Sequence, residues 1–377
     1  MSSAARPRVL AIETSCDDTA CAVVDGAGRV LSSVVSSQLA AHRPYGGVVP
    51  EIASREHLRN WPPVSAEALA RAGLGWPEVD VVAATRGPGL VGALLVGLSL
   101  GKAIAYGLGR PFHAIHHLEG HLYSPFLRPP AAGGAAAEAA EPPPADPVPE
   151  RFTGLVLSGG HTALYGVERG AVDTLGETRD DAMGEVFDKV GKRLSLPYPQ
   201  GPHVDRLAEA ADGGEERTQA GPGRFGVAAL PGHDFSFSGL KSQALKAIEG
   251  LEARGVATDL AAAGEAGAAA VAPGVSHLLA EFRAAAVAQV LGRLERLAEE
   301  RPLGLLAVSG GAAANRRLRR DLAAWCAARG VELRLVPLVY SGDNAAMIAH
   351  AALLRHRRGL ADDPFTAEAA SRLPLAG

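Results

Sequence analysis

The apolar positions of this chain fall into short runs separated by polar turns, and the pattern predicts two β-hairpins. VLAI leads through ETSCDD (13–18) into TACAVV, and GLVL leads through SGGHT (158–162) into ALYGV. One hairpin lies on each side of a segment rich in Ala and Pro at 129–150. The repetition therefore predicts two similar lobes, with a turn from each facing a shared cleft.

A third apolar run, at 303–308, leads into the turn SGGAAAN and a basic helical segment. Gly310 and Gly311 would let the backbone approach a ligand closely, and the start of the following helix favours an anion. Segments with helical periodicity alternate with these strands, at 52–72, 90–108 and 276–299. This alternation predicts an α/β fold.

The chain of 377 residues is long enough for two domains, and its 47% apolar and 21% charged residues are typical of a globular protein. The net charge of −4 gives no sign of nucleic-acid binding, so such a contact would need a local basic patch. The candidates are the arginines of NRRLRR (315–320) and RHRR (355–358), although charged helix faces are usually only solvated.

Several features predict a cytoplasmic protein with no membrane contact. Cys16, Cys21 and Cys326 are an odd number at unrelated spacings, which indicates buried thiols in a reducing compartment. The N-terminal residues lack the uninterrupted apolar core of a signal peptide. The long apolar stretch at 90–108 contains Lys102 and several glycines, which favours a buried helix over a membrane span.

We expect residues 1–127 to form an N-terminal lobe and 151–341 a C-terminal lobe, joined by an insertion or linker at 128–150. A helix at about 342–358 is expected to pack on the first lobe, and 359–377 to form a tail.

In HHLEGH, His117 and His121 are four residues apart, so on a helix both imidazoles project from one face and can share one metal ion. Histidines at this spacing also occur as ordinary surface or core residues. Asp343 is a candidate third ligand, although its place before an expected helix is also typical of an N-cap. Two histidines and one carboxylate predict an iron(II) site, with zinc as the main competitor.

The turn ETSCDD groups Glu13, Asp17 and Asp18. Acids in turns are commonly solvated or capping, but Glu13 and Asp17 are also candidates for general-base work. The turns SGGHT and SGGAAAN together predict a phosphate-binding site. GEVFDKVGKRL (184–194) predicts a helix with surface salt bridges, and FSFSGLKSQ (235–243) predicts a strand at the edge of the core.

The order of these motifs along the chain resembles that of a known family. The motifs are IETSCDDT, GGVVPEIASREH, GPGLVGALLVG, HHLEGH, LSGGHT, GEVFDK, FSFSGLK, SGGAAANRRLR and GDNAAMIA. The chain resembles the bacterial tRNA adenosine threonylcarbamoyltransferase family, TsaD, formerly labelled glycoprotein endopeptidases. The resemblance covers nearly the whole chain outside 129–150 and 250–274.

The resemblance implies a two-lobed actin-like ATPase (ASKHA) fold with duplicated ribonuclease H-like lobes. It implies transfer of a threonylcarbamoyl group from threonylcarbamoyl-AMP to the exocyclic amine of adenosine 37 in tRNAs that read codons starting with A. His117, His121 and Asp343 would hold the metal, iron in the family, and we assign Asp17 as the proton acceptor. The adenylate would contact Val156, Leu157, Ser158, Gly159, Gly160, Asp188, Gly201, Asp205 and Asn315. The implied partners are tRNA, a TsaB-like paralogous scaffold subunit and a TsaE-like small ATPase.

The sequence departs from the family pattern at three places: Gln200 replaces a glycine, 228–230 replace a basic segment that contains proline, and Tyr340 replaces a cysteine. Two other functions share the phosphate-binding turns, namely a small-molecule kinase of the same fold and a non-catalytic, nucleotide-switched binding module. Neither requires a metal site with two histidines and one aspartate. A metallopeptidase would need Glu directly after the first histidine, where this chain has Leu118.

Overall fold

The computed structural model describes residues 7–129, 148–212, 223, 225–261 and 271–375, and these form two compact units. Unit 1 comprises residues 1–149 and 336–377, and unit 2 comprises 150–335. Most of the segment expected to be a linker, 128–150, lies outside the described residues. Residues 336–341, which were expected in the C-terminal lobe, belong to unit 1. Unit 1 also contains the expected tail.

Unit 1 contains a five-stranded sheet in the order β3-β2-β1-β4-β5. Its strands are β1 (Val9–Glu13), β2 (Asp18–Val24), β3 (Val30–Ser37), β4 (Val81–Gly87) and β5 (Phe112–His116). β2 pairs antiparallel with β1 and β3, whereas β4 pairs parallel with β1 and β5.

Unit 2 repeats this topology, with the order β8-β7-β6-β9-β10. Its strands are β6 (Arg151–Leu157), β7 (Thr162–Glu168), β8 (Ala171–Glu177), β9 (Leu305–Ser309) and β10 (Glu332–Leu335). β7 pairs antiparallel with β6 and β8, whereas β9 pairs parallel with β6 and β10. The duplication predicted from the two apolar hairpins is therefore confirmed.

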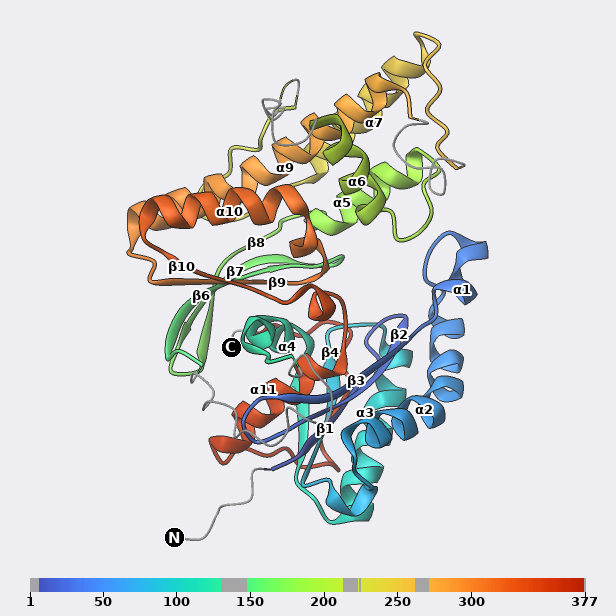
Figure 1. Cartoon of the computed structure of the whole chain (residues 1–377), viewed down its shortest axis with the longest axis vertical. Helices are drawn as coiled ribbons and strands as arrows, with labels where there is room; N and C mark the ends of the chain where they lie inside the picture. The colour runs from blue at the N-terminus through green and yellow to red at the C-terminus, as the bar shows by residue number, and fades with distance from the viewer. Residues whose placement is uncertain (1–6, 130–147, 213–222, 224, 262–270, 376–377) are drawn as a thin grey trace, which may run out of the picture. The chain divides into compact units, whose positions relative to one another are not determined.

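The helices of unit 1 lie on both faces of its sheet (Figure 1). They are α1 (Leu39–His42), α2 (Pro50–Ala72), α3 (Val91–Leu108), α4 (His117–Tyr123) and α11 (Ala345–Arg357), with short 3-10 turns at Arg43–Tyr45, Trp76–Glu78, Ser124–Phe126 and Leu338–Tyr340. Leu10 and Ile12 of β1 share a core with α2 and α3. Because side chains alternate along a strand, Glu13 faces the opposite side, where α4 and α11 lie.

The helices of unit 2 pack on one another and share a core with one face of the sheet (Figure 1). They are α5 (Met183–Arg193), α6 (Gly201–Asp212), α7 (Ser238–Glu252), α9 (Pro273–Glu300) and α10 (Arg316–Arg329), with a 3-10 turn at Gly311–Ala314. The salt bridge expected on α5 is present, since Lys189 Nζ lies 2.7 Å from a carboxylate oxygen of Glu185.

The strand predicted for FSFSGLKSQ is wrong, because this motif forms the entry into α7. Phe235 and Phe237 are buried, and α7 begins at Ser238. The Asp180 carboxylate accepts the backbone N–H groups of Phe237 (2.8 Å) and Ser238 (3.1 Å). A carboxylate at this place satisfies the free donors of a helix start, so the alternating pattern marks an anchored helix terminus.

Helix α3 covers the sheet of unit 1 with only one face. Within the described residues it is the one helix long and apolar enough to span a membrane, a test that core helices also pass. Val91, Leu95 and Tyr106 are exposed, so burial is confined to the side that faces the sheet. On that side a Cβ on Gly97 would lie 2.3 Å from Thr14 Oγ1, so only glycine permits this approach.

Replacing Gly97 by Ala is expected to destabilise the protein by about 2 kcal/mol, because Thr14 is short, buried and already hydrogen-bonded to the Ala93 carbonyl. Gly107→Ala on the same helix meets no atom within 4 Å and should be neutral or stabilise by up to about 1 kcal/mol. Urea unfolding of both variants measures the difference. Equal stabilities would show that the close approach at Gly97 is not a constraint.

Candidate metal centre and nucleotide site

The parallel strands of unit 1 end beside one another and bring polar residues together. Glu13 is the last residue of β1, Thr85 lies near the end of β4, and His117 directly follows β5. The parallel register pairs Ile12 with Ala84, which places Glu13 next to Thr85 on the same face. The carboxyl ends of parallel strands are where α/β folds place their ligands.

His117, His121 and Asp343 meet at this edge of the sheet. Their ligand atoms all lie within 4.8 Å of one another. Asp343 Oδ1 is 3.4 Å from His117 Nε2 and 3.2 Å from His121 Nε2, and the two imidazole rings are nearly perpendicular. Two nitrogens and one carboxylate oxygen aimed at one point form a donor set that fits a divalent transition metal and leaves coordination positions open.

Asp343 is free to face the histidines because its neighbour performs the capping. The sequence left an N-cap as the alternative for Asp343, but the N-cap of α11 is Asn344. The Asn344 side-chain oxygen accepts the Met347 N–H at 3.0 Å. The capping interpretation of Asp343 is therefore wrong, and its carboxylate is available as a ligand.

Glu13 holds His117 from the other side. The His117 Nδ1–H donates to Glu13 Oε2 at 3.2 Å, which leaves Nε2 facing Asp343. Glu13 is fully buried and also accepts from the Ser15 N–H and the Thr85 hydroxyl, both at 2.5 Å. A carboxylate behind a ligating histidine fixes its tautomer and orientation. The geometry therefore favours an orienting role for Glu13 over the base role expected from the sequence.

The charges around His117 make it a strong base in the absence of a metal. Burial alone would lower the pKa of His117, but the Asp343 and Glu13 carboxylates raise it to about 10. His117 in turn lowers the pKa of both carboxyls against the effect of their burial. The proton of the His117 imidazolium lies between the ring and a carboxylate, where a metal ion would bind. Metal binding must therefore displace this proton.

The remaining residues of HHLEGH hold α4 in place. His116 caps the helix by accepting the Leu118 N–H at 3.1 Å. A Cβ on Gly120 would lie 2.8 Å from Ile348 Cδ1, so glycine is needed where α4 crosses α11. Glu119 lies 3.5 Å from Arg355 of α11. These contacts keep the two histidines opposite Asp343.

The turn at 13–18 carries the two other acids predicted to be functional. Asp17 is half-buried, and its carbonyl accepts the Gln38 N–H at 2.9 Å. The environment of Asp18 is unexpected, because its Oδ1 is buried with no hydrogen-bond partner among the described residues. Burial, opposed by a hydrogen bond from Ser37, raises the pKa of Asp18 to about 6. The sequence grouped Asp18 with its neighbours but could not show that one of its carboxylate oxygens is buried without a partner in the described residues.

In unit 2 the two glycine turns predicted to bind phosphate lie against each other. Val156 pairs with Ser309 in the parallel register, so the turns after β6 and β9 leave the sheet side by side. Gly310 has φ of 91°, and a Cβ there would lie 2.3 Å from the Leu157 carbonyl oxygen. A Cβ on Gly184, at the start of α5, would lie 2.6 Å from the Ser158 carbonyl oxygen. These positions require glycine for close backbone packing.

The predicted adenylate contacts divide into open and enclosed positions. Val156 and Leu157 are fully buried in β6, whose backbone pairs with β7 and β9, so they lie inside the sheet and not in the turn. By contrast, Gly159 and Gly160 are exposed, and a Cβ at either would meet no atom within 4 Å. The part of this motif that can meet a phosphate is therefore the turn that begins at Ser158.

The polar candidates of unit 2 already have protein partners. Asp188 accepts the Gly201 N–H at 2.7 Å, and Asn315 caps α10 by accepting the Leu318 N–H at 2.9 Å. Asp205 pairs with the buried Arg283 at 2.9 Å and also accepts the Arg316 N–H at 3.2 Å. These side chains thus fix the starts of α6 and α10, whose N-termini favour an anion.

The departures from the family pattern are accommodated locally. Gln200 is buried, and a Cβ on Gly191 would lie 2.4 Å from the Gln200 Cβ, so Gly191 makes room for it. The carbonyls of Ala228 and Leu230 accept from Arg293, which holds the altered 228–230 loop. Tyr340 is buried in the turn before Asp343.

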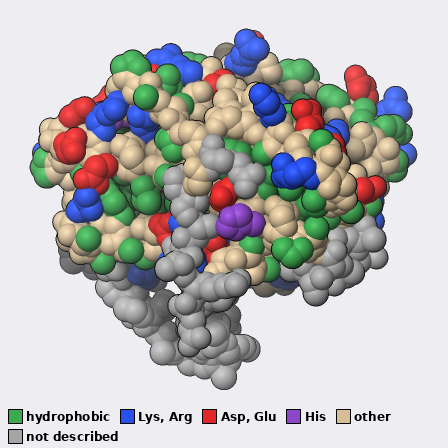
Figure 2. All heavy atoms as spheres, turned by 90° about the horizontal axis from the view of Figure 1, so that it is seen from above, with side chains coloured by type: hydrophobic (Ala, Val, Ile, Leu, Met, Phe, Trp, Pro, Cys, Tyr) green, Lys and Arg blue, Asp and Glu red, His purple; other side chains and the backbone are tan. Residues whose placement is uncertain are grey.

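The two arginine clusters are largely committed to internal contacts. In the first, Arg317 and Arg320 pair with acidic residues of α6 and α10. In the second, Arg355 pairs with Glu119 and Asp362, and Arg357 donates to the Gly26 carbonyl. Figure 2 shows Lys and Arg side chains interspersed with Asp and Glu on one face of the molecule. These arginines therefore contribute to contacts within the protein.

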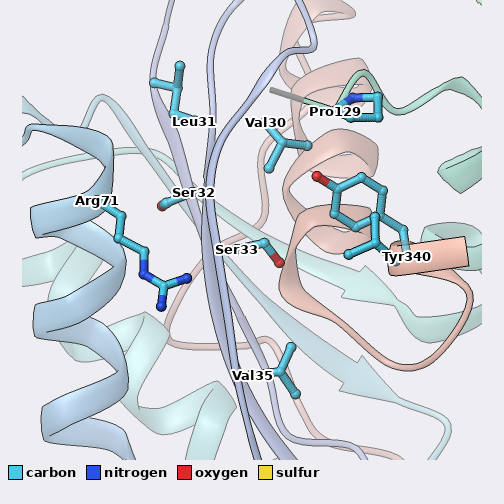
Figure 3. Close-up of a pocket in the computed structure, with 9 residues that line it drawn as sticks. Val30, Leu31, Ser32, Ser33, Val35, Arg71, Pro129 and Tyr340 are labelled. Carbon is cyan, nitrogen blue, oxygen red and sulfur yellow. The ribbon is translucent and has the colours of Figure 1, made fainter. Parts of the chain in front are cut away.

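A pocket of about 430 Å³ lies elsewhere in unit 1, beside the edge strand β3. Figure 3 shows Arg71 of α2 on one side of this strand and Tyr340 on the other. The lining includes Val35, Pro129 and Val339 but no predicted ligand or catalytic residue. The candidate metal centre is therefore identified by its donor atoms and not by this pocket.

Glu13→Gln is expected to weaken metal binding about 10- to 100-fold while the three ligands stay in place, because a neutral amide orients the His117 imidazole less firmly. His117→Ala should abolish binding. Isothermal titration with iron(II) under anaerobic conditions, or with zinc, measures the affinity. Glu67→Gln, which changes an exposed carboxylate on α2, is the control. Wild-type affinity in Glu13→Gln would contradict the orienting role.

Asp18→Asn is expected to stabilise the protein at neutral pH. Because the folded pKa of Asp18 is about 6 and its ordinary value is near 4, its ionisation destabilises the fold as the pH rises from about 4 to 6. Asparagine lacks this penalty, so the variant should match the wild type at about pH 3.5 and exceed it by about 2 kcal/mol at about pH 7.5. Urea unfolding at both pH values tests this. The same stability difference at both pH values would show that the fold does not raise the pKa of Asp18.

Comparison with known proteins places the chain in a family. The family model described as TsaD, tRNA N6-adenosine threonylcarbamoyltransferase, matches residues 29–350. A protein of that name from Cyanothece sp. (strain PCC 7425 / ATCC 29141) is 44% identical over 377 residues, with 97% of each chain covered. Another from Thermus thermophilus is 43% identical, covering 97% of this chain and 98% of the relative.

Among solved structures, T. kodakarensis HypF superposes with a TM-score of 0.56 at 14% identity, covering 94% of this chain and 48% of that chain. At this identity the likeness concerns the fold alone. Together with the duplicated sheets, it identifies the fold as the actin-like ATPase (ASKHA) fold. The family match and the full-length relatives establish that this chain belongs to the TsaD family of tRNA N6-adenosine threonylcarbamoyltransferases.

Proposed function

We propose that this chain transfers a threonylcarbamoyl group from threonylcarbamoyl-AMP to the exocyclic amine of adenosine 37 in tRNAs that read codons starting with A. Membership of the TsaD family along nearly the whole chain supports the reaction. The single structural observation that carries the proposal is the convergence of His117, His121 and Asp343 on one point. Neither a kinase of the same fold nor a nucleotide-switched binding module requires that donor set.

In this proposal the three residues hold one divalent metal, iron(II), with zinc as the competitor. When bound, such a metal supplies a Lewis acid that polarises a carbonyl oxygen of the threonylcarbamoyl group. Glu13 orients His117, and α4 and α11 hold the histidines opposite Asp343. The unit 1 residues thus provide a fixed set of donors that leaves positions open for substrate oxygens.

The unit 2 residues are proposed to bind the adenylate. The turn at 158–160 and the turn at Gly310 and Gly311 offer backbone to its phosphate, next to the starts of α5 and α10. Asp188, Gly201, Asp205 and Asn315 define the rest of this site. Holding the leaving phosphate lowers the barrier to its departure.

The transfer forms one bond and breaks one. The adenine amine nitrogen attacks the carbonyl carbon of the threonylcarbamoyl group, the C–O bond to the phosphate breaks, and AMP leaves with the electron pair. The amine loses one proton, for which Asp17 is the proposed acceptor. Because this amine is a poor nucleophile, positioning and carbonyl activation contribute more than base strength.

The family resemblance also suggests that the reaction takes place in the cytoplasm with two protein partners. These are a TsaB-like paralogous scaffold subunit and a TsaE-like small ATPase, while a separate enzyme makes the adenylate. The test of the function therefore includes these partners.

The proposed function predicts a measurable tRNA product. The purified chain, these partners and the adenylate-forming enzyme are incubated with tRNA, threonine, bicarbonate and ATP, and digested nucleosides are analysed by mass. Threonylcarbamoyl-adenosine should appear with the wild type and be lost, together with bound metal, in His117→Ala. The control is His277→Ala, on the exposed side of α9. No product with the wild type would overturn the proposal, and an active, metal-free His117→Ala would overturn the metal's role.

A further inference from the structure

We propose that His57 positions the turn at 13–18 through a buried hydrogen-bond chain that runs from His42 through Gln38. This assigns a role to the GGVVPEIASREH motif (46–57), which the proposed metal and nucleotide sites leave unexplained. The inference rests on the proposed function, because the turn contains the candidate proton acceptor Asp17. It concerns contacts within unit 1 alone.

His57 is fully buried on α2 and uses both ring nitrogens. Its Nε2 lies 3.0 Å from the Cys16 carbonyl oxygen, so Nε2 must carry the proton and donate. Its Nδ1 then accepts from the Thr19 hydroxyl at 2.8 Å, with the Gln38 amide nitrogen also within reach at 3.1 Å. Burial lowers the pKa of His57, in agreement with a neutral imidazole.

The next members of the chain have equally defined orientations. His42, also fully buried, accepts the Val49 N–H at Nδ1 (3.2 Å) and so donates from Nε2 to Gln38 Oε1 (3.2 Å). This sets the Gln38 amide with its nitrogen toward His57 and the Ala53 carbonyl. The orientation of each side chain is thus set by its neighbours, and the one lone pair of His57 Nδ1 is shared by the Thr19 hydroxyl and the Gln38 amide.

The chain ends on the backbone of the turn. His57 holds the carbonyl of Cys16, and the Gln38 backbone N–H holds the carbonyl of Asp17 at 2.9 Å. At the other end of the same turn, Glu13 and Ser15 contact His117. The turn is therefore fixed on one side by the candidate metal centre and on the other by the His57 chain.

Without His57, the outer half of the turn would lose its side-chain support while Glu13 and the three candidate ligands kept theirs. The transfer rate should fall more than the metal affinity, because Asp17 moves and the ligands do not. A role in folding alone would instead reduce both together. This difference separates a positioning residue from a merely structural one.

Cys16 provides a reporter of the turn that is independent of activity. Its thiol is half-buried in the turn, whereas Cys21 and Cys326 are buried. Its rate of reaction with a neutral maleimide therefore measures how often the turn opens. His57→Phe removes both hydrogen bonds at similar volume, and His57→Gln can still donate to the Cys16 carbonyl.

The experiment uses the full chain with its partners. In His57→Phe, the modification rate of Cys16 should rise about tenfold and the single-turnover transfer rate should fall about tenfold, because the hydrogen bond that holds the Cys16 carbonyl is lost. Metal content and the KM for tRNA should stay within about twofold of the wild type. His57→Gln should recover most of both rates. His350→Phe is the matched control, because His350 is a buried histidine of unit 1 whose ring nitrogens have no partner in the described residues.

Wild-type Cys16 reactivity and transfer in His57→Phe would overturn the proposal. So would parallel losses of transfer, bound metal and folded protein in both His57 variants, since these indicate a structural role. If the wild type forms no product but Cys16 reactivity still rises in His57→Phe, the proposed function fails while the support of the turn by His57 stands.

Discussion

The candidate site depends on a buried imidazole held between two carboxylates. Glu13 fixes His117 through Nδ1, and Asp343 meets it at Nε2. Three ionisable groups so close together in a low-dielectric place are stable only if a cation, either a proton or a metal, completes the charge balance. Since His121 adds a second nitrogen facing the same oxygen, the arrangement is better matched to a metal than to a proton alone.

Much of the surrounding structure serves to bring these groups into contact. Gly97 lets α3 lie on the turn after β1, and Gly120 lets α4 cross α11. Asn344 takes over the cap of α11 and leaves Asp343 free. The motifs that were separate signals in the sequence are thus parts of one packing arrangement, in which glycine permits both of these close approaches.

The sequence predicted those features that depend on local periodicity. The duplicated hairpins gave the two similar sheets, and the spacing of His117 and His121 placed both rings on one face of α4. Asp343 was already a candidate third ligand from its place before an expected helix, and the family resemblance implied the same three ligands. The sequence alone could not predict features that depend on the register between distant strands. Glu13 faces His117 only because β1, β4 and β5 are parallel and aligned.

Other differences between the prediction and the structure arose where a local pattern allows two interpretations. Either Asp343 or Asn344 could cap α11, and only the structure shows which one does. Val156 and Leu157 belong to the same motif as Ser158, but the strand ends one residue before the turn. In FSFSGLK the aromatic and polar residues alternate as they would in a strand. The motif instead leads into α7, where Asp180, from a distant part of the sequence, accepts the Phe237 N–H. Gln38 offered no signal, since its role depends on neighbours contributed by α2.

The central claim is that His117, His121 and Asp343 bind one metal ion. Anomalous X-ray diffraction from crystals of the metal-loaded protein, recorded at the iron and zinc absorption edges, tests it most directly. The account predicts one strong peak in unit 1, about 2.0–2.2 Å from a nitrogen of each histidine and an oxygen of Asp343. No peak at these residues, or a peak bound by other side chains, would contradict it.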